Sequence, residues 1–302
     1  MFPTNPITVK VAIPHFFQES YSTNYGSSRV GNKIDREFAF YNCLSSLLAV
    51  GDSHSNTYLD LARTCLVPFS FSDCLIGPIQ LDIHIFINNH DCLPTVLDHF
   101  ESLITLHKLG LDDPRLLPSH ASRFLLENDS PFELNYYTED DLVIRDPYFF
   151  SKQLWFLTQT SHRFVLMPHR FEQCVGSYPN KLFVDGPNSR LPESASELDK
   201  RNNNLERICA SGIDPLTNTK IDFVYAQNPH SGCFILSKKQ INYLQDGQLR
   251  AKTFISELET AATGSVYPHF SILKPSWFHS WFLQVQHSNP SFLTLLNKWN
   301  YE

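Results

Sequence analysis

Residues 132–160 read FELNYYTEDDLVIRDPYFFSKQLWFLTQT, and this stretch decides the fold of the 302-residue chain. Its first residues alternate between apolar and more polar side chains, which predicts a partly buried strand. Three acids follow at once, Glu139, Asp140 and Asp141, and acids disfavour both strands and cores. An Asp-Pro pair at 146–147 then predicts the start of a helix. The order strand, acidic loop, helix predicts an α/β fold with the acids at the carboxyl end of a buried strand.

The acidic loop admits two interpretations. In open α/β sheets ligands bind at the carboxyl ends of strands, and adjacent carboxylates there suit a hard divalent cation that neutralises phosphate oxygens. The alternative is an acidic turn that only keeps a surface loop solvated. The residues of the loop alone leave both open.

Composition sets the broad class of protein. A hydrophobic content of 42% and an aromatic content of 13% are enough for one large domain or two small lobes. A net charge of -7 without a dense Lys/Arg cluster argues against nucleic acid as a partner. Seven scattered cysteines without a CxxC pair favour a reducing compartment and argue against structural zinc. No window reaches the roughly 18 apolar residues of a membrane span, so we expect a cytoplasmic protein without a transmembrane segment.

Hydrophobic periodicity predicts further strands and helices on both sides of the acidic loop. The predicted strands are 9–17, 81–88, 164–168, 181–184, 223–226, 233–236 and 270–275, and the predicted helices are 35–51, 94–109, 119–128, 147–160, 237–247 and 254–263. Residues 186–220 are the most polar part of the chain and too long for an ordinary connection. They are predicted to form a mobile flap or an acceptor-side insertion rather than a domain linker.

The segment TEDDLVIRDPYFF, 138–150, resembles the Asp-x-Asp region of GT-A glycosyltransferases in its Glu-Asp-Asp variant. The run IPHFF at 13–17 is similar to the start of a bacterial group assigned as glycosyltransferases. The resemblance implies a GT-A-like, Rossmann-type α/β/α sandwich with a mostly parallel mixed central sheet. It also implies a single domain, 1–302, with a nucleotide-binding half at about 1–145 and an acceptor-side half at about 146–302.

The resemblance further implies a reaction and its metal. A sugar would pass from a nucleotide-sugar donor, most simply a UDP-sugar, to a hydroxyl group of a saccharide or lipid-linked acceptor with the help of Mn²⁺ or Mg²⁺. Asp141 would bind the metal directly, while Glu139 and Asp140 would contact ribose, sugar hydroxyls or metal-bound water. His287 would complete the metal shell, with His279 as its nearest rival.

The resemblance also implies candidate contacts to the donor at positions outside the acidic loop. They are His15, Tyr25, Arg29, Asn88 with Asn89, Arg123 and His230. For each of them a structural role is the alternative: a solvated loop, a histidine at a sheet end, a surface arginine or a plain tight turn.

Glu257 and Glu259 are the candidate catalytic bases. They lie two residues apart on a predicted helix and so point about 200° apart, which leaves only one to face a cleft. The resemblance places the base of inverting enzymes near the start of this helix, where the macrodipole stabilises a carboxylate, and this favours Glu257. The usual x-Glu-Asp motif is replaced here by Glu257-Leu258-Glu259, which leaves the choice open.

Two other functions fit the same residues. A metal-dependent nucleotidyltransferase has a similar sheet and acids but carries a Gly-rich basic loop after the first strand, which residues 25–29 only faintly suggest. A degenerate GT-A-like binding module would lack activity. Separately, the aromatic run WFHSWF at 277–282 suits either a core strand or contact with a lipid-linked acceptor or a membrane surface.

Overall fold

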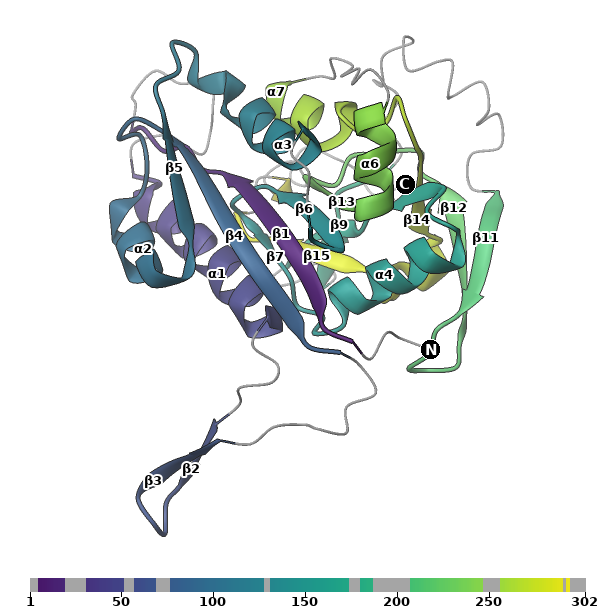
Figure 1. Ribbon diagram of the computed structural model, residues 1–302, viewed down its shortest axis with the longest axis horizontal. Helices are drawn as coiled ribbons and strands as arrows, with labels where there is room; N and C mark the ends of the chain where they lie inside the picture. The colour runs from purple at the N-terminus through teal and green to yellow at the C-terminus, as the bar shows by residue number, and fades with distance from the viewer. Residues whose placement is uncertain are drawn as a thin grey trace.

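The computed structural model describes residues 5–19, 31–51, 57–68, 77–127, 131–173, 180–186, 207–246, 256–289 and 292–293. Its centre is a five-stranded sheet with the order β13-β6-β1-β4-β5 (Figure 1). Four of these strands are parallel, and β13 pairs antiparallel with β6. Their bounds are β1 Ile7–Pro14, β4 Ile79–Asn88, β5 Thr105–Leu109, β6 Leu134–Thr138 and β13 Cys233–Ser237. The mostly parallel mixed sheet predicted from the sequence is confirmed.

Helices cover both faces of this sheet, because its central strands are apolar on both sides, as parallel strands usually are. One face packs on α1 (Lys33–Gly51), α2 (Pro94–His99) and α4 (Phe149–Gln159). The other packs on α3 (Leu117–Glu127) and α6 (Lys238–Asp246). Two separate apolar cores result. With helices on both faces of the sheet (Figure 1), the predicted α/β/α sandwich is confirmed.

Two smaller sheets extend the carboxyl-terminal half. One has the order β10-β9-β15-β7 and the other β11-β12-β14-β8. Their bounds are β7 Leu142–Val143, β8 Phe164–Leu166, β9 His169–Gln173, β10 Lys181–Phe183, β11 Ile208–Ile213, β12 Lys220–Tyr225, β14 Ser271–Pro275 and β15 Gln284–His287. The pairing of β15 with β7 brings His287 next to Leu142, the residue that follows the acidic loop.

Short helical turns and one hairpin complete the described elements. The turns are η2 Glu101–Leu103, η3 Pro114–Leu116, α7 Glu257–Glu259, the π-helical turn η6 Thr260–Gly264 and η7 Trp277–Phe282. The hairpin pairs β2 (Thr57–Asp60) with β3 (Cys65–Pro68), was not predicted, and contacts the rest of the fold little (Figure 1).

Three sequence predictions need correction. The helix predicted over 94–109 ends early, and its last residues form β5, because they pair along β4 and stack His107 on Phe86. Part of the predicted flap 186–220 is ordered as a strand: β11 lies within it and pairs with β12, while residues 187–206 lie outside the described residues. The run WFHSWF forms the 3₁₀ helix η7 rather than a strand, with Phe278 91% exposed and Phe282 buried.

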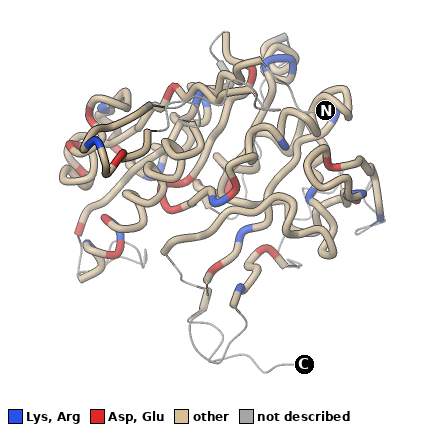
Figure 2. Tube along the Cα trace, turned by 90° about the horizontal axis from the view of Figure 1, so that it is seen from below, with Lys and Arg blue, Asp and Glu red and all other residues tan. Residues whose placement is uncertain are grey.

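Charged residues of both signs are interspersed along the described chain rather than gathered on separate faces (Figure 2). None of the helices in the described part combines the length and the apolar character that crossing a bilayer requires.

Candidate active site

The acidic loop lies at the carboxyl end of β6, next to the carboxyl end of the parallel strand β1. Every residue of β6 is buried, and the chain leaves the sheet at Glu139 because carboxylates are poorly suited to a core strand. Two backbone bonds fix the loop: the Glu139 amide donates to the Gly232 carbonyl at 3.0 Å, and the Ser288 amide donates to the Asp141 carbonyl at 2.8 Å. The predicted position of the loop at a strand end is confirmed.

Asp140 is held from two sides. Nη2 of Arg36 lies 2.7 Å from each of its carboxylate oxygens. Nδ1 of His15 lies 2.6 Å from Oδ2 of Asp140, and Nε2 of His15 accepts the Leu93 amide at 3.0 Å. Because Nε2 accepts, the ring proton is on Nδ1 and is donated to Asp140. Burial would raise the pKa of Asp140, but the Arg36 charge and this hydrogen bond outweigh it and lower the pKa.

Asp141 is only partly satisfied. Its Oδ2 lies 3.3 Å from Nη1 of Arg36 and 3.4 Å from Nε2 of His287. Its Oδ1 is buried and has no hydrogen-bond partner in the described part of the chain. Burial opposes ionisation, but the charges of His287 and Arg36 outweigh it and lower the pKa of Asp141. The loop therefore holds one buried oxygen of an ionised carboxylate that has no hydrogen-bond partner among the described residues.

His287 stands between two carboxylates. Its Nδ1 lies 2.9 Å from Oε1 of Glu172, a buried acid that also accepts the amides of Phe292 at 3.1 Å and Leu293 at 2.8 Å. Burial lowers the pKa of His287, but Asp141 and Glu172 outweigh it and raise the pKa to about 10. The ring is therefore protonated at neutral pH. The rival, His279, lies elsewhere and accepts the Asp222 amide at 3.1 Å.

Glu139 faces the turn at 228–232. Its Oε1 lies 4.0 Å from Nε2 of His230, whose Nδ1 is 3.0 Å from Oγ1 of Thr263. Burial, with help from Asp141, raises the pKa of Glu139 to about 7. The turn can approach this closely because Gly232 has a φ of 64° and no side chain: an added Cβ would lie 2.8 Å from Oε2 of Glu139.

A cavity of about 350 Å³ opens onto the acidic loop, within the size range of small-molecule sites. Its polar and charged lining residues are Arg36, Glu139, Asp140, Asp141, Glu257, Gln18 and Arg115. Its apolar lining residues are Pro14, Phe16, Pro114, Leu117, Pro118 and Leu258. The cavity can hold a ligand with a charged part and a flat or apolar part.

The two candidate bases are placed differently. Glu257 lines the cavity, whereas the carboxylate of Glu259 accepts the hydroxyl of Ser256, the residue that caps α7. Only three residues form α7 before the chain continues as η6, so the macrodipole argument for the base carries less weight than a long helix would give it.

The other predicted donor contacts that the structure describes do not line this cavity. His15 is fully buried and stacks on Phe40 at 4.0 Å between ring centroids. The side chain of Asn88 exchanges two hydrogen bonds with the Leu111 backbone, and Arg123 is exposed on α3. Tyr25 and Arg29 lie outside the described residues.

Asp141 is the residue that fits a divalent cation, because its carboxylate is ionised, its Oδ1 has no hydrogen-bond partner among the described residues, and the residue lines the cavity. Among the residues that the structure describes, no group of three or more His, Cys, Asp or Glu side chains could hold a metal ion. A cation here would need further oxygens from a substrate and from water, as Mg²⁺ commonly does. A protonated His287 has no lone pair for a metal, so ligation through it would release a proton.

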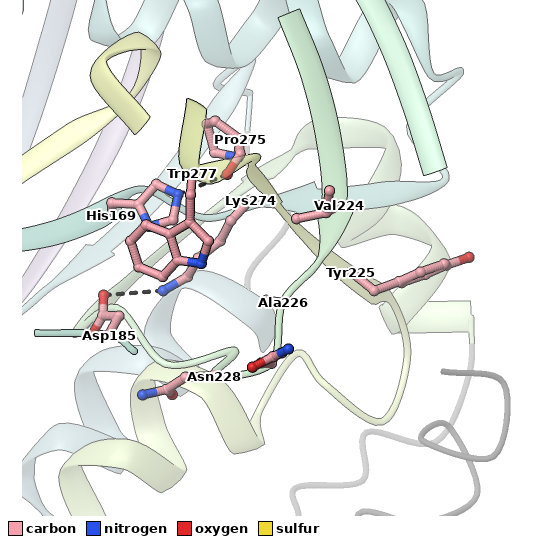
Figure 3. A pocket seen from close by; sticks show the side chains of 10 residues that line it. His169, Asp185, Val224, Tyr225, Ala226, Asn228, Lys274, Pro275 and Trp277 are labelled. Atoms are coloured by element: carbon pink, nitrogen blue, oxygen red, sulfur yellow. Dashed lines mark hydrogen bonds and ion pairs between the residues drawn. The ribbon is translucent and has the colours of Figure 1, made fainter. Parts of the chain in front are cut away.

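A second, smaller hollow of about 20 Å³ has room for about one water molecule. Its walls include Asp185, Lys274 and Trp277 (Figure 3). Nζ of Lys274 lies 3.0 Å from Oδ2 of Asp185 and 2.9 Å from the carbonyl oxygen of His230. This buried ion pair therefore anchors the turn that contacts Glu139.

No protein-family model matches the sequence, and no curated protein does. Among solved structures, the chain is similar to S. aureus TarS 1-349, with a TM-score of 0.42 and 11% identity over 90% of this chain and 58% of that one. A complex of TarS 1-349 with UDP matches with a TM-score of 0.41 and 12% identity, again over 90% of this chain and 58% of that one. The complex with UDP-GlcNAc matches with a TM-score of 0.41 and 10% identity over 90% of this chain and 56% of that one. The chain thus spans less than two thirds of these proteins, and at such TM-scores the likeness carries no argument about function.

Proposed function

We propose that the protein is a glycosyltransferase that moves a sugar from a nucleotide-sugar donor, most simply a UDP-sugar, to a hydroxyl group of a saccharide or lipid-linked acceptor. One observation carries the proposal: the acidic loop, Arg36 and Glu257 meet at one cavity at the carboxyl ends of two parallel strands. Ligands of open α/β sheets bind at this edge. The sequence resemblance of the loop to the Asp-x-Asp region supports the same reaction.

The mixed lining of the cavity suits the mixed chemistry of such a donor. Apolar residues such as Phe16 and Leu117 would contact the base, and the charged residues would contact the diphosphate and sugar. Oδ1 of Asp141 would hold Mn²⁺ or Mg²⁺ together with diphosphate oxygens. When bound, such a cation supplies positive charge that neutralises the diphosphate as it leaves.

Proton transfer falls to Glu257, the candidate base that lines the cavity. The acceptor oxygen forms a bond to the anomeric carbon while the bond from that carbon to the diphosphate oxygen breaks. The bonding electrons leave with the nucleoside diphosphate, and Glu257 takes the proton of the acceptor hydroxyl. Attack opposite the leaving group inverts the anomeric configuration.

Binding of the nucleotide tests this function most directly. We expect UDP with Mn²⁺ to raise the Tm, since a ligand at 100 times its Kd stabilises by about 2.7 kcal/mol. EDTA should abolish the shift, and so should Asp141→Asn in a protein that remains folded by circular dichroism. If no nucleoside diphosphate or sugar nucleotide changes the Tm, with or without Mn²⁺ or Mg²⁺, the proposed function is wrong.

A further inference from the structure

Arg36 lies between the two aspartates of the acidic loop. It comes from the first turns of α1, is 6% exposed and lines the cavity. Nη2 contacts both oxygens of Asp140 at 2.7 Å, and Nη1 lies 3.3 Å from Oδ2 of Asp141. The guanidinium group therefore acts as the counter-ion of the carboxylates that would otherwise attract a cation.

This arrangement leaves one polar atom of Arg36 and one of Asp141 without a hydrogen-bond partner among the described residues. These atoms are Nε of Arg36 and Oδ1 of Asp141, and both are buried. Buried polar atoms are nearly always paired, so an open donor and an open acceptor in one cluster indicate a missing ligand. The donor suits an anion and the acceptor suits a cation. A metal diphosphate carries both.

Charge decides which of the two can bind first. A divalent cation at Asp141 would sit beside a guanidinium group already bonded to the same carboxylate, and like charges that close repel strongly in a buried site. A diphosphate reduces this repulsion, because its negative charge lies between the two cations and the planar fork of arginine binds phosphate oxygens in a bidentate manner. Arg36 can then turn from Asp141 to the diphosphate.

We propose that Arg36 is a built-in counter-ion that weakens metal binding in the donor-free site and becomes a ligand of the donor diphosphate, so that metal and nucleotide bind with positive coupling. The inference rests on the proposed function and deepens it. Thermodynamic reciprocity adds that UDP must tighten Mn²⁺ binding by the same factor as Mn²⁺ tightens UDP binding.

The loop does not depend on Arg36 alone. His15 keeps its hydrogen bond to Asp140 when the guanidinium group turns away. The ring is fixed by the Leu93 amide and by stacking on Phe40. Asp140 therefore stays in place while Asp141 is released toward the metal.

Isothermal titration of Mn²⁺ into the protein, with and without saturating UDP, tests the proposal. In the parent we expect UDP to tighten Mn²⁺ binding by about tenfold or more, within the usual range of coupling between sites. Arg36→Gln should bind Mn²⁺ alone about tenfold more tightly than the parent and should lose most of the coupling. Lys33→Gln is the matched control: it removes a cation from the same helix, where Lys33 is half exposed and 3.9 Å from Glu37. It should keep the parental values.

Arg36→Lys separates charge from geometry and serves if Arg36→Gln does not fold. It should bind Mn²⁺ alone as weakly as the parent but bind UDP less tightly, because an ammonium group lacks the planar fork. The proposal is overturned if Arg36→Gln binds Mn²⁺ no more tightly than the parent, or if Arg36→Lys binds UDP as well as the parent does. If the parent binds no UDP, the proposed function fails, and the Mn²⁺ titration of Arg36→Gln still decides the counter-ion role.

Discussion

Two buried clusters of carboxylates and cations lie close together in this fold and differ in how completely they are paired. In the cluster around Asp185, Oδ1 contacts Nε of Arg170 at 3.0 Å, and Oδ2 accepts the Arg170 amide at 3.0 Å and Nζ of Lys274 at 3.0 Å. In the acidic loop, Oδ1 of Asp141 is buried without a partner among the described residues, and Asp141 lines a cavity of about 350 Å³. We call the Asp185 cluster the closed cluster, because both oxygens of its carboxylate are paired, and it supports the fold. We call the acidic loop the open cluster, because it keeps an unpaired carboxylate oxygen and lines a cavity, and it is suited to a ligand.

The open cluster should show its largest effect in catalysis. If Glu257 takes the acceptor proton, Glu257→Gln should lower kcat by about 10²- to 10⁴-fold with little change in donor affinity. Steady-state kinetics of nucleoside diphosphate release would measure it. Glu259→Gln is the matched control, because that carboxylate is bonded to Ser256 rather than lining the cavity. Near-parental turnover of Glu257→Gln would rule out this base.

The closed cluster should show its effect in stability. Asp185→Asn leaves Arg170 and Lys274 buried without their counter-charge, which we expect to cost about 3–5 kcal/mol of unfolding free energy. Urea denaturation would measure the loss. Glu37→Gln, which removes an acid from a more exposed ion pair with Lys33, should change stability by less than about 1 kcal/mol. An Asp185→Asn protein as stable as the parent would remove the distinction between the clusters.

The pH dependence of stability tests the charge of His287 in the open cluster. The folded pKa of His287 is raised to about 10 from an ordinary value of 6.5, because Asp141 and Glu172 stabilise its charge. Between these values the folded state binds more protons than the unfolded state, so its contribution is complete below pH 6.5 and is lost as the pH rises toward 10. Denaturation at several pH values should show a steeper loss over this range in the parent than in His287→Gln. Parallel curves would contradict the assignment.

The smallest effect should come from the turn that joins the two clusters. Gly232→Ala places a side chain at a φ of 64° and a Cβ 2.8 Å from Oε2 of Glu139. A left-handed backbone costs an L-residue about 1–2 kcal/mol, so the unfolding free energy should fall by about that amount. Gly186→Ala is a suitable control, since nothing lies within 4 Å of its added Cβ. Equal losses in both variants would show that neither the backbone conformation at Gly232 nor the contact with Glu139 constrains the turn.

The sequence predicts the parts of the fold that rest on local pattern. A continuous apolar run marks β1, an alternating isoleucine-rich run marks β4, and the acids that end β6 mark the site, because each signal lies within a few neighbouring residues. The sequence does not reveal Arg36. One arginine in an amphipathic helix has no pattern of its own, and its partner Asp140 is 104 residues away in the chain. The same holds for Glu172, which meets His287 only because β9 and β15 pair.

The sequence predicts the wrong type of secondary structure where pairing with a distant strand outweighs the local sequence pattern. Residues 105–109 lack a clear strand pattern in the sequence, and they form an edge strand because they pair with β4. The two glutamates of 257–259 cannot be distinguished by periodicity, since the difference arises from the Ser256 hydroxyl, which is a local cap rather than a face of a long helix.

Glu172 also bears on how the chain can be engineered. Its carboxylate joins the ring of His287 to the amides of Phe292 and Leu293. Shortening the chain before Phe292 would remove two of these hydrogen bonds and loosen the ring that contacts Asp141. A tag or fusion partner is therefore better inserted in the exposed turn at 61–64 of the β2–β3 hairpin than placed next to the last described residues.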